Sequence, residues 1–229
     1  MLDRPVWAAL NTAHLGLSLG GALARRYAAD VNLFASARDD GAAALTALTE
    51  LVQPGERVYL AQVPSIVVPS GLVAIKSSQG VQMVATRSVA AAELDVDIVE
   101  LTDRDAPEML ALATLTEPGP FLSRTHTMGA FRGIRIAGRL VAMAGERFRF
   151  PDYTEVSGVC THPDFRGRGL ARRLSAAVAS RIESRGERPF LHAWKANRAA
   201  ISLYESLGFE IRAEIDIKVV ERPLHGTSA

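Results

Sequence analysis

Apolar residues recur at two different spacings along the chain, and each spacing predicts a different kind of element. In residues 41–52, Leu45, Leu48 and Val52 lie three to four positions apart, which predicts an amphipathic helix ended by Pro54-Gly55. Shorter apolar runs follow, separated by turn residues, and these are typical of strands. The predicted strands are residues 57–62, 72–76 and 81–86. The first third of the chain therefore has the pattern of a small α/β unit.

The second half of the chain has a more regular pattern. Thr102 followed by Asp105 is a helix start, because a threonine side chain caps the first turn and acidic residues suit its positive dipole. Predicted strands are residues 96–101, 131–136, 139–145, 153–161 and 189–194, with one or two more in 209–220. Predicted long helices are residues 169–185 and 197–207. Strand–helix alternation after residue 150 predicts a layered α/β (α+β) fold with local parallel pairing.

Length and composition limit the domain count and the class of protein. The 229 residues suffice for one large domain or two small ones. Residues 88–95 are rich in alanine and lack a strand pattern, so we expect a linker there. This predicts an N-terminal accessory α/β domain, residues 1–94, and a second domain, residues 95–229. An apolar fraction of 48% and a charged fraction of 22% are those of an ordinary globular protein.

Charge and cysteine content exclude several functions. A net charge of +1 argues against nucleic acid or a membrane surface as the partner. Of the 26 basic residues only three are lysines, a bias that fits either a GC-rich genome or phosphate contacts. The single cysteine excludes an intramolecular disulfide framework, and the five histidines show no metal-ligand spacing, so no metal is expected.

The N-terminal segment has two interpretations. The stretch between Arg4 and Arg25 is uncharged and resembles a weak signal peptide. Asp3 and Asn11, among other polar residues, interrupt that pattern and favour a partly buried N-terminal helix. No run of apolar residues is long enough to span a membrane. We therefore expect a cytoplasmic protein.

The most informative segment is a glycine-punctuated loop between a predicted strand and a predicted helix. Gly167 and Gly169 allow backbone conformations closed to other residues, and the free N–H groups of the following helix form an anion site. Four arginines, Arg166, Arg168, Arg172 and Arg173, lie beside it. The segment lacks the Gly-Lys-Ser/Thr ending of a P-loop, and Arg172 stands where a dinucleotide fingerprint has its third glycine. A phosphate or pyrophosphate is the expected ligand.

Three blocks in residues 153–209 resemble the GNAT superfamily of N-acetyltransferases. They are residues 155–163 (EVSGVCTHP), 166–171 (RGRGLA) and 197–209 (NRAAISLYESLGF), in the family's order and spacing. The resemblance extends loosely back to Val96 and does not cover residues 1–90. It implies a mixed, splayed central sheet flanked by helices. It also implies acetyl-CoA as co-substrate, and it leaves the acceptor open among a small amine, an amino acid and a protein or peptide N-terminus. A degenerate second copy of the fold in the N-terminal region rests on the order of elements alone.

The resemblance implies roles for the residues around the loop. The Val159 N–H polarises the thioester carbonyl, and the strand edge binds the pantetheine arm as an added strand does. Gly158 predicts a β-bulge that aims this N–H and splays the sheet. The implied acetyl-CoA-binding residues are Val159, Cys160, Thr161, Arg166, Gly167, Arg168, Gly169, Leu170, Ala171, Arg172 and Asn197.

Two residues are the candidate catalytic groups. The resemblance implies that Tyr204 protonates the departing coenzyme A thiolate; the alternative is a tyrosine that only packs on the sheet. Glu155 lies four residues before Val159, so strand alternation predicts that both point to one face. Burial there would raise the pKa of Glu155 toward that of a useful base. The alternative is a solvated glutamate at the start of the strand.

The remaining alternatives concern the reaction and the partners. Cys160 alternates to the face opposite Val159, which favours packing over nucleophilic catalysis. Without a placed nucleophile we expect direct transfer in a ternary complex. The rival functions are a non-catalytic acyl-CoA-binding sensor and a nucleotide-phosphate enzyme. The polar loop around His126 is a weak acceptor-site candidate, and a homodimer is compatible with the family resemblance although no surface patch in the sequence supports it.

Overall fold

One eight-stranded mixed sheet runs through most of the molecule. The computed structural model describes residues 1–89 and 97–224. The strand order is β4-β11-β5-β10-β9-β8-β7-β6, with antiparallel neighbours except for the parallel pair β10 and β9. In that order the strands are Arg57–Gln62, Phe209–Glu221, Val73–Ala85, Arg188–Trp194, Tyr153–Thr161, Arg139–Phe150, Phe131–Ile136 and Ile98–Leu101.

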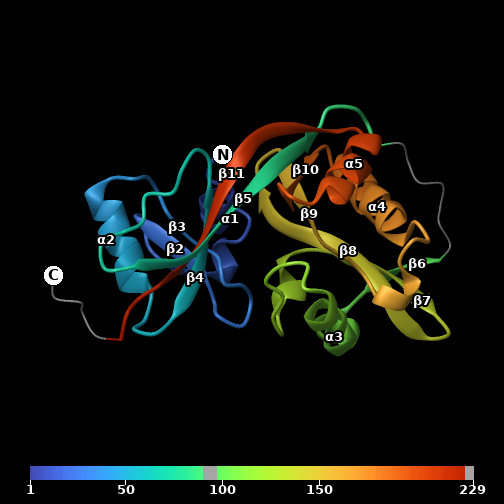
Figure 1. Ribbon diagram of the computed structural model, residues 1–229, viewed down its shortest axis with the longest axis horizontal. Helices are drawn as coiled ribbons and strands as arrows, with labels where there is room; N and C mark the ends of the chain where they lie inside the picture. Colours follow the sequence, from blue (N-terminus) through green and yellow to red (C-terminus); the bar gives the residue numbers. More distant parts are fainter. Residues whose placement is uncertain (90–96, 225–229) are drawn as a thin grey trace.

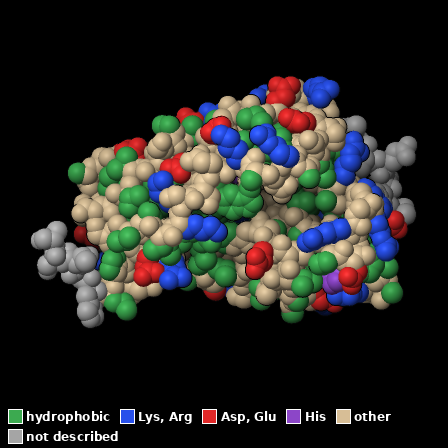
Figure 2. All heavy atoms as spheres, viewed as in Figure 1, with side chains coloured by type: hydrophobic (Ala, Val, Ile, Leu, Met, Phe, Trp, Pro, Cys, Tyr) green, Lys and Arg blue, Asp and Glu red, His purple; other side chains and the backbone are tan. Residues whose placement is uncertain are grey.

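Two parts of the molecule are joined by the long strands β5 and β11 (Figure 1). One part holds the N-terminal helices α1 (Pro5–Leu10) and α2 (Ala42–Leu51) and a small antiparallel sheet. The strands of that small sheet are β1 (Ser18–Gly20), β2 (Ala24–Tyr27) and β3 (Ala35–Ala37). The other part holds α3 (Ala106–Thr116), α4 (Leu170–Ser184) and α5 (Arg198–Ser206). The space-filling view shows apolar side chains around a hollow between the two parts (Figure 2).

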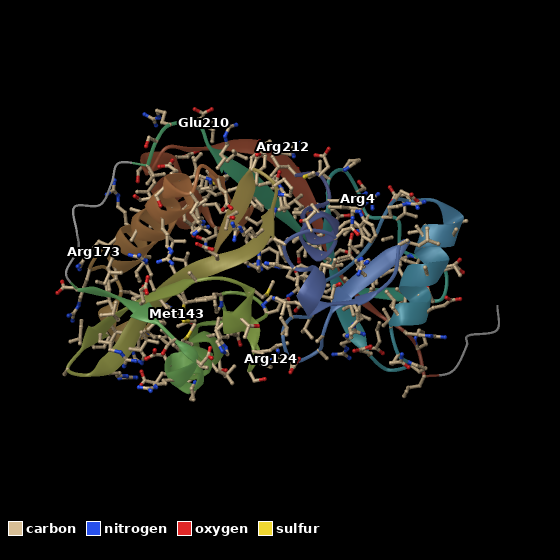
Figure 3. All side chains as sticks on the ribbon, turned by 180° about the vertical axis from the view of Figure 1, so that it is seen from behind. Arg4, Arg124, Met143, Arg173, Glu210 and Arg212 are labelled. Carbon is tan, nitrogen blue, oxygen red and sulfur yellow. The ribbon has the colours of Figure 1, made fainter. Side chains whose placement is uncertain are left out.

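The helices of the second part cover opposite faces of the large sheet. Met143 and Ala144 are neighbours on β8, so their side chains point to opposite faces. Met143 packs in the cluster that contains Met109 of α3, and Figure 3 shows it beside that helix. Ala144 packs in the cluster formed under α4 and α5. The sheet is therefore the middle of three layers.

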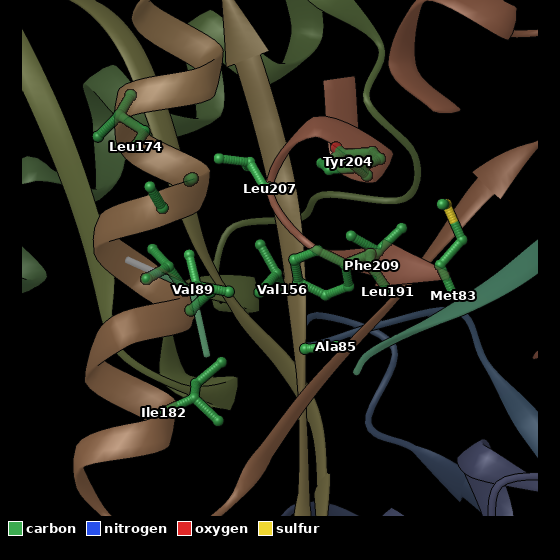
Figure 4. Close-up of a cluster of buried hydrophobic side chains, with 14 of the residues drawn as sticks. Met83, Ala85, Val89, Val156, Leu174, Ile182, Leu191, Tyr204, Leu207 and Phe209 are labelled. Atoms are coloured by element: carbon green, nitrogen blue, oxygen red, sulfur yellow. The ribbon is translucent and has the colours of Figure 1, made fainter. Parts of the chain in front are cut away.

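Helix α4 is held by an apolar stripe of regular spacing. Leu174, Val178 and Ile182 lie four residues apart and are buried. They pack toward sheet residues such as Val156 and Phe209 in the largest apolar cluster (Figure 4). This packing fixes the position of the loop that precedes the helix.

The large sheet continues across the domain boundary expected at residues 94 and 95. Strand β5, from the first part of the sequence, lies between β10 and β11, and β4 pairs with the outer edge of β11. The two parts thus share a continuous ladder of backbone hydrogen bonds.

Most predicted elements are present, with some differences. The helix at 41–52, the strand at 57–62 and the helix start at Thr102 are confirmed. The expected strands 72–76 and 81–86 form one strand, because residues 77–80 pair with β11 instead of turning. The N-terminal helix is only Pro5–Leu10, followed by a short 3₁₀ turn and β1. Residues 90–95 of the expected linker lie outside the described residues. In the described part of the chain, no helix combines the length and apolar character that a membrane span needs.

The position of β5 generates a prediction about folding. A fragment of residues 97–229 would lack the strand between β10 and β11 and would leave both edges unpaired. We expect this fragment to show no cooperative thermal transition by circular dichroism. Co-expression with residues 1–89 should restore a single transition. A cooperative transition in the isolated fragment would contradict the prediction.

Candidate active site

A split in the large sheet forms the centre of the site. Strands β9 and β10 pair only through Tyr153–Glu155 and Arg188–Phe190, and β10 then continues along β5 alone. Beyond that point the facing edge of β9 pairs with no strand in the described part of the chain. A cavity of about 670 Å³ lies at the split. Its walls come from both faces of the sheet, so it passes through the layer.

The β-bulge predicted at Gly158 is present. Ser157 pairs with Gly145 and Cys160 with Met143, so Gly158 and Val159 together face one residue of β8. The φ of Gly158 is 62°, in the left-handed region.

The bulge reverses the alternation of side chains along β9. Val156 and Val159 consequently both pack against the cluster under α4. The expectation that Glu155 and Val159 share a face is therefore wrong, because the extra residue shifts every later side chain to the other face.

The glycine loop ends on an uncapped helix. Gly167 and Gly169 have φ values of 75° and 72°, and Gly169 is the N-cap of α4. Among residues 1–89 and 97–224, no side chain caps the helix, so its first N–H groups line the cavity mouth without a partner from that part of the chain. A Cβ at either glycine would meet no atom within 4 Å, so backbone conformation and not crowding requires glycine there. The loop has the donors and the dipole to bind an anion.

The four arginines beside the loop differ in their surroundings. Arg166 and Arg172 line the cavity. Arg168 does not line it and lies over the Phe165 ring, 5.0 Å from the ring centroid. Arg173 forms an ion pair with Asp97 at 2.9 Å. The expected cluster of four therefore presents two guanidinium groups to the cavity.

Tyr204 and Asn197 belong to the wall formed by α5. The Asn197 side chain caps this helix by accepting a hydrogen bond from the Ala200 N–H at 3.1 Å. Tyr204 lines the cavity and is 9% exposed, and burial raises its pKa to about 12. The phenol is therefore protonated throughout the neutral range.

Glu155 is fully buried in a network of donors, which excludes the solvated alternative for this carboxylate. Arg147 donates to it through Nε at 2.7 Å and Nη2 at 2.6 Å, and His192 Nδ1 lies 2.7 Å away. Burial alone would raise the pKa of Glu155, but the charge and hydrogen bonds of Arg147, together with the hydrogen bond from His192, lower it to about 2. The expectation of a raised pKa is therefore wrong. The cause is Arg147, eight residues away on the adjacent strand.

The hydrogen bonds of Gln82 determine the orientation of His192. Arg212 donates to Gln82 Oε1 at 2.8 Å, so Gln82 Nε2 is the donor to His192 Nε2 at 3.0 Å. His192 Nε2 accepts, and its Nδ1–H donates to Glu155. Arg212 also pairs with Asp3 at 2.6 Å, and Figure 3 shows Arg212 at the junction of the two parts.

Cys160 has the packing role expected of it. It is buried in the cluster that contains Met109 and Met143. Burial raises the pKa of its thiol to about 11, so the thiolate is scarce at neutral pH.

The cavity brings together every predicted site residue except Glu155 and Arg168. It also contains residues that the sequence analysis missed. They are Phe34, Tyr59, Thr116, Glu117, Pro118, Gly119, Pro120, Arg147, His192 and Ile217. Phe34 and Tyr59 lie more than 80 positions before the family-like blocks, and no local spacing links them to the site.

Comparisons with known proteins agree with this geometry. Residues 128–216 match the model of the FR47-like protein family. A solved structure from Novosphingobium aromaticivorans, assigned to the GNAT family of acetyltransferases, is 42% identical over 96% of this chain and 98% of its own, with a TM-score of 0.91. The chain belongs to the GNAT family. The splayed sheet flanked by helices is thus the GNAT fold.

Two further relatives match this chain, one in structure and one in a short stretch of sequence. A GCN5-related N-acetyltransferase from Kribbella flavida is 18% identical over 96% of this chain and 95% of its own, with a TM-score of 0.64. A mycothiol acetyltransferase from Thermobispora bispora is 46% identical over 56 residues. That match covers 24% of this GNAT protein and 19% of the relative's length.

The low pKa of Glu155 generates a prediction about stability and pH. Glu155→Gln should lower the free energy of unfolding at pH 7 by about 3–5 kcal/mol, because the Arg147 charge stays buried without its counter-ion. Below pH 5 the unfolded glutamate takes up a proton that the folded one, with a pKa of about 2, does not. The wild-type advantage should therefore shrink between pH 5 and pH 2.

Urea denaturation at pH 7 and pH 3.5 measures both effects. Glu50→Gln, at an exposed position of α2, is the control and should leave stability unchanged at both pH values. If the difference in free energy of unfolding between wild type and Glu155→Gln is the same at both pH values, the carboxylate is not held in its charged form.

Proposed function

We propose that this GNAT protein transfers an acetyl group from acetyl-CoA to a primary amine by direct attack in a ternary complex. One observation carries the proposal: the uncapped start of α4, the bulged edge of β9 and the Tyr204 phenol open into a single cavity. Acetyl-CoA needs an anion site for its pyrophosphate, a strand edge for its amide arm and a donor for its sulfur. These three requirements match the three features.

The residues fit acetyl-CoA in the following roles. Backbone N–H groups from Gly167 to Arg172 bind the pyrophosphate, with Arg166 and Arg172 adding charge. The free edge of β9 at Val159, Cys160 and Thr161 pairs with the pantetheine amides, and the Val159 N–H polarises the reacting carbonyl. Asn197 contacts the same arm from α5.

Tyr204 is the proposed proton donor to the leaving thiolate, supported by its protonated phenol in the cavity wall. Glu155 does not line the cavity, and with a pKa of about 2 its carboxylate is too weak a base near neutral pH. We assign it a positioning role toward Arg147 and His192. The buried Cys160 thiol, with its raised pKa, supports transfer without an acyl-enzyme.

The two parts of the chain have different proposed roles. Residues 95–229 carry the acetyl-CoA site, and residues 1–94 supply β5 and, through Phe34 and Tyr59, part of the wall opposite α5. A cytoplasmic location is consistent with the single unpaired cysteine.

Substitution of Tyr204 tests the chemistry. Tyr204→Phe should lower kcat about 100-fold with little change in KM for acetyl-CoA, because the ring still packs and only the proton donor is lost. Release of coenzyme A with a panel of amines is the measurement. Tyr153→Phe is the matched control, since Tyr153 does not line this cavity. Acetyl-CoA binding without turnover by the wild-type protein would favour the rival function, an acyl-CoA-binding sensor.

Substitution of Arg172 tests the anion site. Arg172→Ala should raise KM for acetyl-CoA about tenfold and leave kcat near the wild-type value, since a charge-assisted phosphate contact is lost. Arg181→Ala, farther along α4 and paired with Glu100, is the control. Equal KM values for both variants would place the pyrophosphate elsewhere.

A further inference from the structure

We infer that the acceptor is an amine that also bears a carboxylate, a free amino acid, and that Arg147 binds that carboxylate through Nη1. This inference rests on the proposed acetyl transfer and names the substrate class of that site.

Arg147 presents one nitrogen to the cavity. Its Nε and Nη2 donate to Glu155, while Nη1 donates to no other residue in the part of the chain that the structure describes. The side chain is 15% exposed, and it lines both the large cavity and a small hollow next to it. Nη1 carries two N–H donors. Because these donors have no partner among the described residues and face the cavity, they can bind an anion there.

Glu155 orients this guanidinium without needing Nη1. The carboxylate already has Arg147 Nε and Nη2, His192 Nδ1 and the Phe148 backbone N–H at 3.3 Å as partners. Aromatic rings fix the plane further, because Arg147 Cζ lies 5.2 Å from the Phe34 ring centroid and 4.6 Å from that of Phe148. Arg147 is therefore pre-organised, which reduces the entropy cost of binding.

Arg147 is placed on the acceptor side of the reacting bond. It lies on β8 next to the bulged part of β9, and the small hollow is lined by Arg147, Ser157 and Gly158 together. The glycine loop at the start of α4, proposed for the pyrophosphate, lines the large cavity but not the small hollow. A carboxylate on Nη1 thus keeps a short molecule beside the Val159 N–H.

The charges of the cavity favour an anionic acceptor over a polycation. Among the described lining residues Glu117 is the one acidic side chain, against Arg147, Arg166 and Arg172. Glu146, in the small hollow, is already paired with Arg185 at 2.8 Å. A polyamine would find no free carboxylate besides Glu117, whereas an amino acid finds an unused N–H pair. Phe34 and Tyr59 offer apolar surface for its side chain.

The experiment compares matched acceptors with one another, each assayed with the unmodified full chain. For several side chains, the free amino acid, its carboxamide and its decarboxylated amine are assayed with acetyl-CoA by coenzyme A release. We expect kcat/KM for the amino acid to exceed that for the carboxamide by about tenfold or more, the value of one charge-assisted contact. Equal or faster turnover of the carboxamide would overturn the inference while leaving acetyl transfer intact.

Arg147→Lys is the informative variant, because lysine retains the charge beside Glu155 but has no second donor group. It should abolish the preference for the carboxylate without changing KM for acetyl-CoA. Arg149→Lys, on the same strand but paired with Glu187 outside the cavity, is the control and should retain the preference. Retention of the preference in Arg147→Lys would overturn the assignment to Nη1.

Calorimetric binding in the presence of coenzyme A separates this inference from the proposed function. If no amine is acetylated, the proposed function fails. Amino acids that then bind at least about tenfold more tightly than their carboxamides still support the carboxylate site. Equal binding of both forms would overturn it.

Discussion

The early end of the parallel pairing between β9 and β10 is the constraint on which the site depends. After three paired residues the two strands separate, and the backbone groups of β9 lose the partners that a closed sheet would supply. Buried backbone groups without partners are costly, so a ligand with amide groups has a ready place there. The bulge at Gly158 and Val159 adds to the separation. It increases the local twist of β9, which stays paired with β8 on one edge and turns away from β10 on the other.

A buried ion pair lies at the centre of a hydrogen-bond network beside the split. Arg147 holds Glu155 through Nε and Nη2, and His192 and Gln82 extend the chain of hydrogen bonds to Arg212 and Asp3 at the surface. Gln82 also donates to the Leu2 carbonyl oxygen at 2.9 Å. A buried charge is tolerated when its donors and acceptors are matched, and here the matching partners come from both parts of the molecule. The same network that orients the site therefore ties the N-terminus to it.

The N-terminal part contributes to the second part through backbone and side chains alike. Strand β5 completes the sheet between β10 and β11, and Phe34 and Tyr59 line the cavity opposite α5. The ring centroids of Phe34 and Tyr59 lie 5.6 Å apart, and Phe34 also contacts Phe148 of β8. The eight-stranded sheet thus takes strands from both sides of the alanine-rich segment, although that segment suggested a domain boundary.

The sequence by itself determined the elements and the anion loop, because these depend on neighbours along the chain. Apolar spacing placed α2, Gly158 marked the bulge, and Gly167 and Gly169 marked the turn into α4. Only the tertiary structure decided the state of Glu155. Its burial predicted a raised pKa, but Arg147 on the adjacent strand reverses the sign, and strand pairing is not encoded in local spacing. The structure also decided which face Glu155 occupies, since one extra residue in a bulge inverts the alternation. Phe34 and Tyr59 reach the cavity only because β4 and β5 join the sheet of a distant segment, and such long-range pairing depends on the packing of the whole chain.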